Sequence, residues 1–106
     1  MRLTGEDAIN RLAKLAATHF SLKAEVKAGN VVDCSVSGFL TFDPDDGFVV
    51  SNYDSGRLTI APDGIEACDI NEELVAKGNP ILDSKIGLSS GTIALRGDIQ
   101  VILTRR

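Results

Sequence analysis

The stretch that decides the fold is Ile93-Ala94-Leu95-Arg96-Gly97-Asp98-Ile99-Gln100-Val101-Ile102. Its two flanks are apolar, and the three residues between them are of kinds that form tight turns. Because glycine adopts backbone angles that other residues avoid, Gly97 suits the centre of such a turn. The pattern therefore predicts two buried strands, 92–96 and 98–104, joined by a turn that holds Arg96 and Asp98 close together.

Upstream of this hairpin the sequence alternates between apolar and polar residues, as half-buried strands do. The alternation extends over residues 21–42 and is divided by Gly29, which suits a two-residue hairpin turn. Gly38 interrupts the apolar face of the second strand, which indicates a bend or bulge where the sheet curls. With the shorter apolar runs that follow, strands are predicted within 21–70 and 92–104.

Two regions have helical spacing instead. The first, about 5–19, has apolar residues three and four positions apart and follows Thr4, which is placed to open a capping box. The second lies in an insertion at about 57–91, where Asp69 and Glu72 have capping-box spacing. We therefore predict an N-terminal helix, and one or two helical turns within the insertion.

At 106 residues the chain is expected to form a single domain, 1–106. One helix and many short strands with tight turns predict a mainly β fold, a small, strongly bent and closed five-stranded barrel with a helical insertion. The last strand, 98–104, is apolar on both faces, and a bare strand of this kind would template aggregation. We therefore expect its edge to pair with a neighbouring subunit in a homo-oligomer.

Composition disfavours several classes of protein. The sequence has no run of about 18 apolar residues, and its N-terminal segment is charged and amphipathic, so we expect a cytoplasmic protein without a membrane partner. Cys34 and Cys68 lack the spacing of a metal site and are expected to be free, buried thiols, with a disulfide as the alternative. Because no nucleophile elbow, phosphate-binding glycine loop or paired Cys/His set occurs, we expect no enzyme, no cofactor and no metal.

Charge is distributed unevenly along the chain. Residues 1–42 have five basic and four acidic residues, residues 43–83 have two and ten, and residues 84–106 have four and one. The three regions therefore carry net charges of +1, −8 and +3, and the whole chain carries −4. A strongly negative surface attracts basic partners and repels polyphosphates, so the middle region is typical of an acidic protein–protein interaction module or inhibitor.

Two motifs resemble those of a known family. Leu95-Arg96-Gly97-Asp98-Ile99-Gln100-Val101-Ile102, and Gly38-Phe39-Leu40-Thr41-Phe42-Asp43 after the turn at Gly29, are similar to the second and first motifs of the Sm-like (LSm) family of RNA-binding ring proteins. The resemblance covers about 20–60 and 92–104. It implies a homo-oligomeric ring that binds nucleic acid, single-stranded RNA or DNA, at a repeated site.

The resemblance also implies a base-binding pocket. The guanidinium plane of Arg96 would stack on a base, Asp98 would accept a hydrogen bond from it, and Gly97 would allow it to approach closely. Because a ring repeats each contact, modest affinity at one pocket would become useful avidity.

The loop at 43–47 would border this pocket, and it departs from the family pattern. Asp45 stands where a stacking side chain is usual, and Gly47 stands where an asparagine is usual. The carboxylates of Asp43, Asp45 and Asp46 should also repel phosphate. The candidate nucleic-acid-binding residues are therefore Arg96, Gly97, Asp98, Asp43, Asp45 and Gly47.

The same residues have simpler interpretations. Arg96-Gly97-Asp98 also fits a plain hairpin turn with an exposed ion pair, and Asp43-Pro44-Asp45-Asp46-Gly47 also fits a solvated turn. Two functions therefore stay open. The first is a nucleic-acid-binding ring, and the second is an acidic protein–protein interaction module without nucleic-acid binding.

Overall fold

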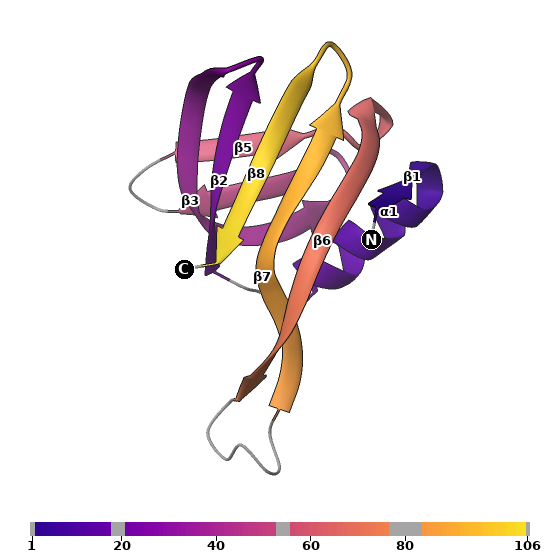
Figure 1. The fold of residues 1–106 in the computed structure, drawn as a ribbon, viewed down its shortest axis with the longest axis vertical. Helices are drawn as coiled ribbons and strands as arrows, with labels where there is room; N and C mark the ends of the chain where they lie inside the picture. Colours follow the sequence, from indigo (N-terminus) through magenta and orange to yellow (C-terminus); the bar gives the residue numbers. More distant parts are fainter. Residues whose placement is uncertain (1, 18–20, 53–55, 77–83, 106) are drawn as a thin grey trace.

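The computed structural model describes residues 2–17, 21–52, 56–76 and 84–105 (Figure 1). In chain order, its elements are β1 (Arg2–Thr4), α1 (Gly5–Ala16), β2 (Ser21–Ala28), β3 (Val31–Asp43), β4 (Gly47–Asn52), β5 (Gly56–Ile60), the 3-10 helix η1 (Pro62–Gly64), β6 (Ile65–Ala76), β7 (Ser84–Leu95) and β8 (Ile99–Arg105). The prediction of a mainly β fold with an N-terminal helix is confirmed.

The strands of the described residues form one antiparallel sheet in the order β1-β6-β7-β8-β2-β3-β4-β5. Strands β8, β2, β3, β4 and β5 are consecutive neighbours within it. The sheet is open, because no strand pairing among the described residues joins β5 to β1 at the opposite edge. The prediction of a closed five-stranded barrel is therefore wrong, because the described residues form eight strands in a sheet that does not close.

The C-terminal strand β8 is internal to the sheet. It pairs with β7 on one side, from Leu95↔Ile99 to Ser90↔Thr104, and with β2 on the other. Its apolar character on both faces therefore fits a central strand. The prediction that its edge pairs with a neighbouring subunit is wrong, because β7 of the same chain occupies that edge; a homo-oligomer that uses other contacts stays a prediction.

The helical turns predicted in the insertion are wrong as well. β6 continues as a strand through Asp69 and Glu72 to its end at Ala76, because β7 provides backbone hydrogen-bond partners along its whole length. After Asp69, β6 no longer pairs with β1. Before Ser90, β7 does not yet pair with β8. The two strands therefore extend as a two-stranded arm, which Figure 1 shows projecting below the rest of the sheet.

The first helix begins differently from the predicted capping box. Thr4 pairs with Ala67 as the last residue of β1, and its side chain makes no cap hydrogen bond. Gly5, with φ of +56°, instead turns the chain sharply from β1 into α1. The helix ends at Ala16, and the last two residues of the predicted range lie outside the described residues.

A bend in β3 gives the sheet its two layers. The first part of β3 pairs with β2 up to Phe39, and the last part pairs with β4 from Phe39 onward. Gly38 lies at this change of partner, where a Cβ atom would stand 2.0 Å from the carbonyl oxygen of Ser51. The bend predicted at Gly38 is therefore confirmed, and Figure 1 shows β4 and β5 crossing behind β2 and β8.

The core fills the space between these layers and α1. Phe48 of β4 is its largest fully buried side chain, and Leu12 contributes from the helix. The described core cluster consists of Ala8, Leu12, Leu15, Ala16, Leu22, Ala24, Val36, Leu40, Phe48, Val50, Ile60, Ile65, Cys68, Ile93, Val101 and Leu103. Within the described ranges, the helix is too short and too polar to cross a membrane.

Candidate functional site

Three turns meet at one end of the sheet. The turn Arg96-Gly97-Asp98 links β7 to β8, and the Gly29 N–H donates to the Asp98 carbonyl over 3.5 Å. On its other side, the Arg96 N–H donates to the Gly64 carbonyl at the end of η1 over 3.2 Å. Because backbone groups hold it on both sides, this turn is fixed relative to the β2–β3 turn and η1.

The predicted hairpin turn is confirmed, and its backbone conformation explains why two of its three positions are occupied by glycine and aspartate. Gly97 and Asp98 have φ of +79° and +60°, in the left-handed region. Glycine enters this region freely, and aspartate is one of the few other residues that does so at all often. Gly97 and Asp98 therefore have a structural reason to be present whether or not they contact a ligand.

The side chains of Arg96 and Asp98 both reach solvent. The ion pairs of the described residues include neither of them, so the exposed pair of the simpler interpretation is not formed. The structure thus leaves one guanidinium and one carboxylate available for a ligand at this turn.

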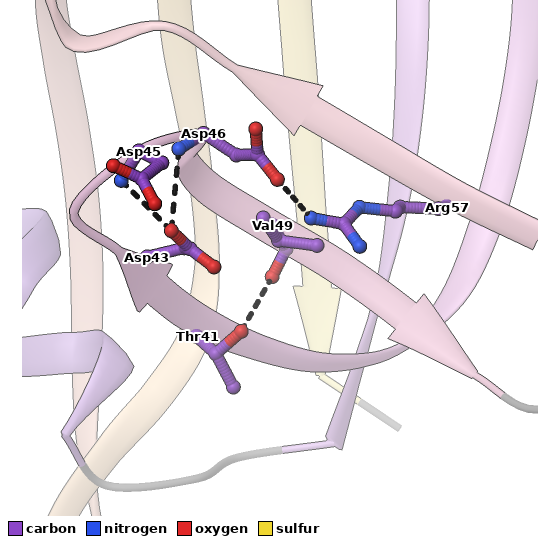
Figure 2. Close-up of polar contacts among 6 residues, drawn as sticks. All are labelled: Thr41, Asp43, Asp45, Asp46, Val49 and Arg57. Atoms are coloured by element: carbon purple, nitrogen blue, oxygen red, sulfur yellow. Dashed lines mark hydrogen bonds and ion pairs between the residues drawn. The ribbon is translucent and has the colours of Figure 1, made fainter.

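In the second candidate loop, 43–47, two carboxylates bind other groups of the protein (Figure 2). Asp43 Oδ1 accepts hydrogen bonds from the Asp45 N–H at 2.8 Å and the Asp46 N–H at 3.3 Å. Asp46 Oδ2 lies 2.5 Å from Nη2 of Arg57 on β5. Asp43 and Asp46 therefore stabilise the loop and fasten it to β5, so neither is a free contact for a base.

Gly47 also has a structural role. Its φ is +89°, and a Cβ atom there would stand 2.6 Å from the carbonyl oxygen of Ile60 and 2.7 Å from Cδ of Pro62. This close approach requires glycine and packs the loop against the chain between β5 and η1. The loop and the turn at 96–98 therefore flank the same connecting segment, although no hydrogen bond or ion pair between them occurs in the described residues.

Loop 43–47 packs against the segment that leads into η1, and acidic residues lie in the loop, in η1 and at the start of β6. We call the set Asp45, Asp46, Asp63 and Glu66 the acidic rim. All four residues are exposed, and Glu66 lies at an irregularity where β6 bulges against β7. Only Asp46 has a cationic partner among the described residues. The other three carboxylates of the acidic rim, those of Asp45, Asp63 and Glu66, are therefore not balanced by a cation in the described part of the chain.

Exposed apolar residues on β3 were not recognised from the sequence. The exposed large hydrophobic residues of the described chain are Val31, Val32, Phe39 and Phe42, with 68%, 47%, 52% and 47% of their surface accessible. Val31 and Val32 immediately follow the β2–β3 turn. Adjacent strand residues face opposite sides, so this apolar pair was a signal that at least one side chain lies outside the core.

The two cysteines are free, as predicted, but the prediction that both are buried is wrong for Cys34, which is exposed; Cys68 is buried. Burial raises the pKa of the Cys68 thiol, which donates to the Ala8 carbonyl over 3.8 Å. Among the side chains that the structure describes, no three His, Cys, Asp or Glu residues gather as metal ligands.

Comparison with known proteins gives no match to a family model, a curated protein or a solved structure. The resemblance to the Sm-like family therefore stays a prediction.

Proposed function

We propose that this chain is a non-enzymatic binding module that recognises a basic segment of a partner protein through the acidic rim. The observation that carries the proposal is the packing of loop 43–47 against the segment that enters η1, because four exposed carboxylates with a single cationic partner among the described residues lie within a few residues of this contact along the chain. Such a surface attracts cations and speeds their encounter with the protein.

The geometry also weakens the competing proposal of a base pocket. Asp43 and Gly47, two of the six candidate residues, are used to build and pack the loop. The third, Asp45, lies in the acidic rim, which repels the phosphates of a nucleic acid. Because β8 is paired on both sides within the chain, it is not available to join subunits into the ring that would have repeated the site.

Nucleic-acid binding stays as a second candidate for one reason. Arg96 and Asp98 are exposed at a rigidly held turn, and neither takes part in an ion pair within the described chain. An arginine plane stacks on unpaired bases, so a single-stranded oligonucleotide could be held here without a ring.

The experiment that separates the two is a pair of titrations, one with an oligolysine peptide and one with oligouridine. We expect the peptide to bind and the oligonucleotide not to bind. The variant Asp45→Asn/Asp63→Asn/Glu66→Gln should weaken peptide binding by on the order of tenfold, since tenfold corresponds to about 1.4 kcal/mol spread over three exposed charges. Added salt should weaken the wild-type interaction as well.

The matched control changes net charge equally at other places. The variant Glu6→Gln/Asp7→Asn/Glu25→Gln removes three carboxylates outside the acidic rim and should bind the peptide nearly as well as the wild type. Equal losses in both variants would show that overall charge, and not the acidic rim, attracts the peptide. Oligouridine binding that Arg96→Ala abolishes would instead establish the second candidate.

A further inference from the structure

We propose that the partner binds as an extended strand, with alternating apolar and basic residues, added to the free edge of β5. This inference rests on the proposed function, because it specifies the form in which a basic segment reaches the acidic rim. It is carried by the unpaired edge of β5, by an uncovered apolar end of the sheet beside that edge, and by the carboxylates next to it.

The edge of β5 is available for pairing. Among the described residues, β5 is the last strand of the sheet and pairs with β4 alone, through its five residues Gly56–Ile60. In an antiparallel pair every second residue turns its N–H and C=O away from the partner, so β5 presents main-chain donors and acceptors to a further strand. At the opposite side of the sheet, β1 covers only Ala67–Asp69 of β6, and the outer edge of β6 beyond Asp69 is also unpaired among the described residues, but Figure 1 shows that it lies on the projecting arm, away from the turn end of the sheet.

The inner face of the sheet loses its cover at the turn end. Along β2, Ala24 is buried, Val26 on the same face is half-buried, and Ala28 is exposed. Along the paired strand β8, Val101 is buried and Ile99 is half-buried. On both strands, burial therefore decreases toward the turns. This indicates that the layer that packs against this face does not extend over the turn end of the sheet.

Figure 1 shows why the cover ends there. The β2–β3 and β7–β8 turns extend beyond the level at which β5 crosses behind these strands. A strand added to β5 would lie about 4.8 Å further toward the turns. Its inward side chains would then cover the half-buried Val26, Ile99 and Leu58 and the exposed Val31, which is why alternate residues of the partner should be apolar.

The outward side chains of the added strand would lie beside the acidic rim. Arg57 projects from β5 on that side, but its charge is already balanced by Asp46. Asp45, Asp63 and Glu66 have no cationic partner among the described side chains. Basic residues at the positions between the apolar ones would therefore be favoured, and a peptide with acidic residues there would be repelled.

The test uses an acetylated hexapeptide of alternating lysine and valine, and two versions of it. One version carries N-methyl groups on every lysine and the other on every valine, so charge and sequence are unchanged. Along a strand, the N–H groups of alternate residues point to the same edge. We therefore expect one methylated version to bind at least tenfold more weakly than the parent, and the other to bind within about threefold of it, by calorimetric titration.

Equal binding of all three peptides would overturn strand addition while leaving recognition by charge intact. Failure of the parent peptide to bind would overturn the proposed function together with this inference. Sedimentation of the free chain gives one more decisive outcome: a dimer that the peptide fails to dissociate, with the β5 amides already protected, would show that a second copy occupies the edge and would contradict the proposal.

Discussion

Replacing Gly38 by alanine is expected to cause the largest loss of stability among the glycine-to-alanine changes at the glycines whose surroundings the structure describes. The new Cβ would stand 2.0 Å from the Ser51 carbonyl oxygen and 2.5 Å from its carbon, both of which are backbone atoms that cannot rotate away. Relieving the clash requires β3 and β4 to separate where β3 bends. We expect a loss of about 3 kcal/mol or more in the free energy of unfolding.

The measurement is urea unfolding of Gly38→Ala beside a matched control, Gly64→Ala. A Cβ at Gly64 meets no atom within 4 Å, and its φ is outside the left-handed region, so this variant should change stability by less than about 1 kcal/mol. Equal stability of the two variants would mean that β3 and β4 do not approach at Gly38, and the bend in the sheet would have to be placed elsewhere.

Replacing Phe48 by alanine is expected to have the second large effect. This residue is fully buried at the centre of the core cluster, and its ring lies against the ring of Phe42, with 5.1 Å between centroids. Truncation leaves a cavity between the sheet layers, and the expected loss is about 3–5 kcal/mol. Chemical unfolding measures it, as a lower midpoint with an unchanged slope.

Phe42→Ala is the natural control, because it removes the other ring of the same pair. Phe42 is 47% exposed, so its truncation leaves little cavity and should remove about 1 kcal/mol, largely the ring–ring contact. If both phenylalanines contribute equally, the core does not lie on the Phe48 side of β4, and the layer arrangement described above is wrong.

The local strands were predictable because each has a strong local signal. The alternation over 21–42 gives β2 and most of β3, and Gly29 divides them as expected. The glycine at 38 breaks the apolar face for a reason that steric contact with Ser51 makes clear. Where the pattern has period two and a turn residue separates the runs, sequence alone identifies the strands.

The insertion was mispredicted because its signal is short and ambiguous. An Asp and a Glu three residues apart occur in a strand as readily as at a helix start, and brief apolar runs such as Leu74-Val75 fit either structure. The strand conformation of this segment depends on the long-range pairing of β6 with β7, which a short stretch of sequence does not reveal. The same limit applies to β8. Apolar residues on both of its faces are compatible with a central strand and also with an edge strand that pairs with another subunit.

The candidate site was predictable in position but not in its details. The turn at 96–98 and the loop at 43–47 form where expected and flank one connecting segment. The sequence could not show that Asp43 is used by the backbone of its own loop, or that Gly47 is needed for packing against Pro62. It also did not reveal the free edge of β5, because an edge is a property of the whole sheet.

Residue-by-residue amide hydrogen exchange, with and without the lysine–valine peptide, distinguishes an internal β8 and a partner-binding β5 edge from the alternatives. We predict slow exchange throughout the paired part of β8 in both samples, and fast exchange at alternate amides of β5 that becomes slow when the peptide is added. Fast exchange along β8, or β5 amides that the peptide leaves unchanged, would contradict the account.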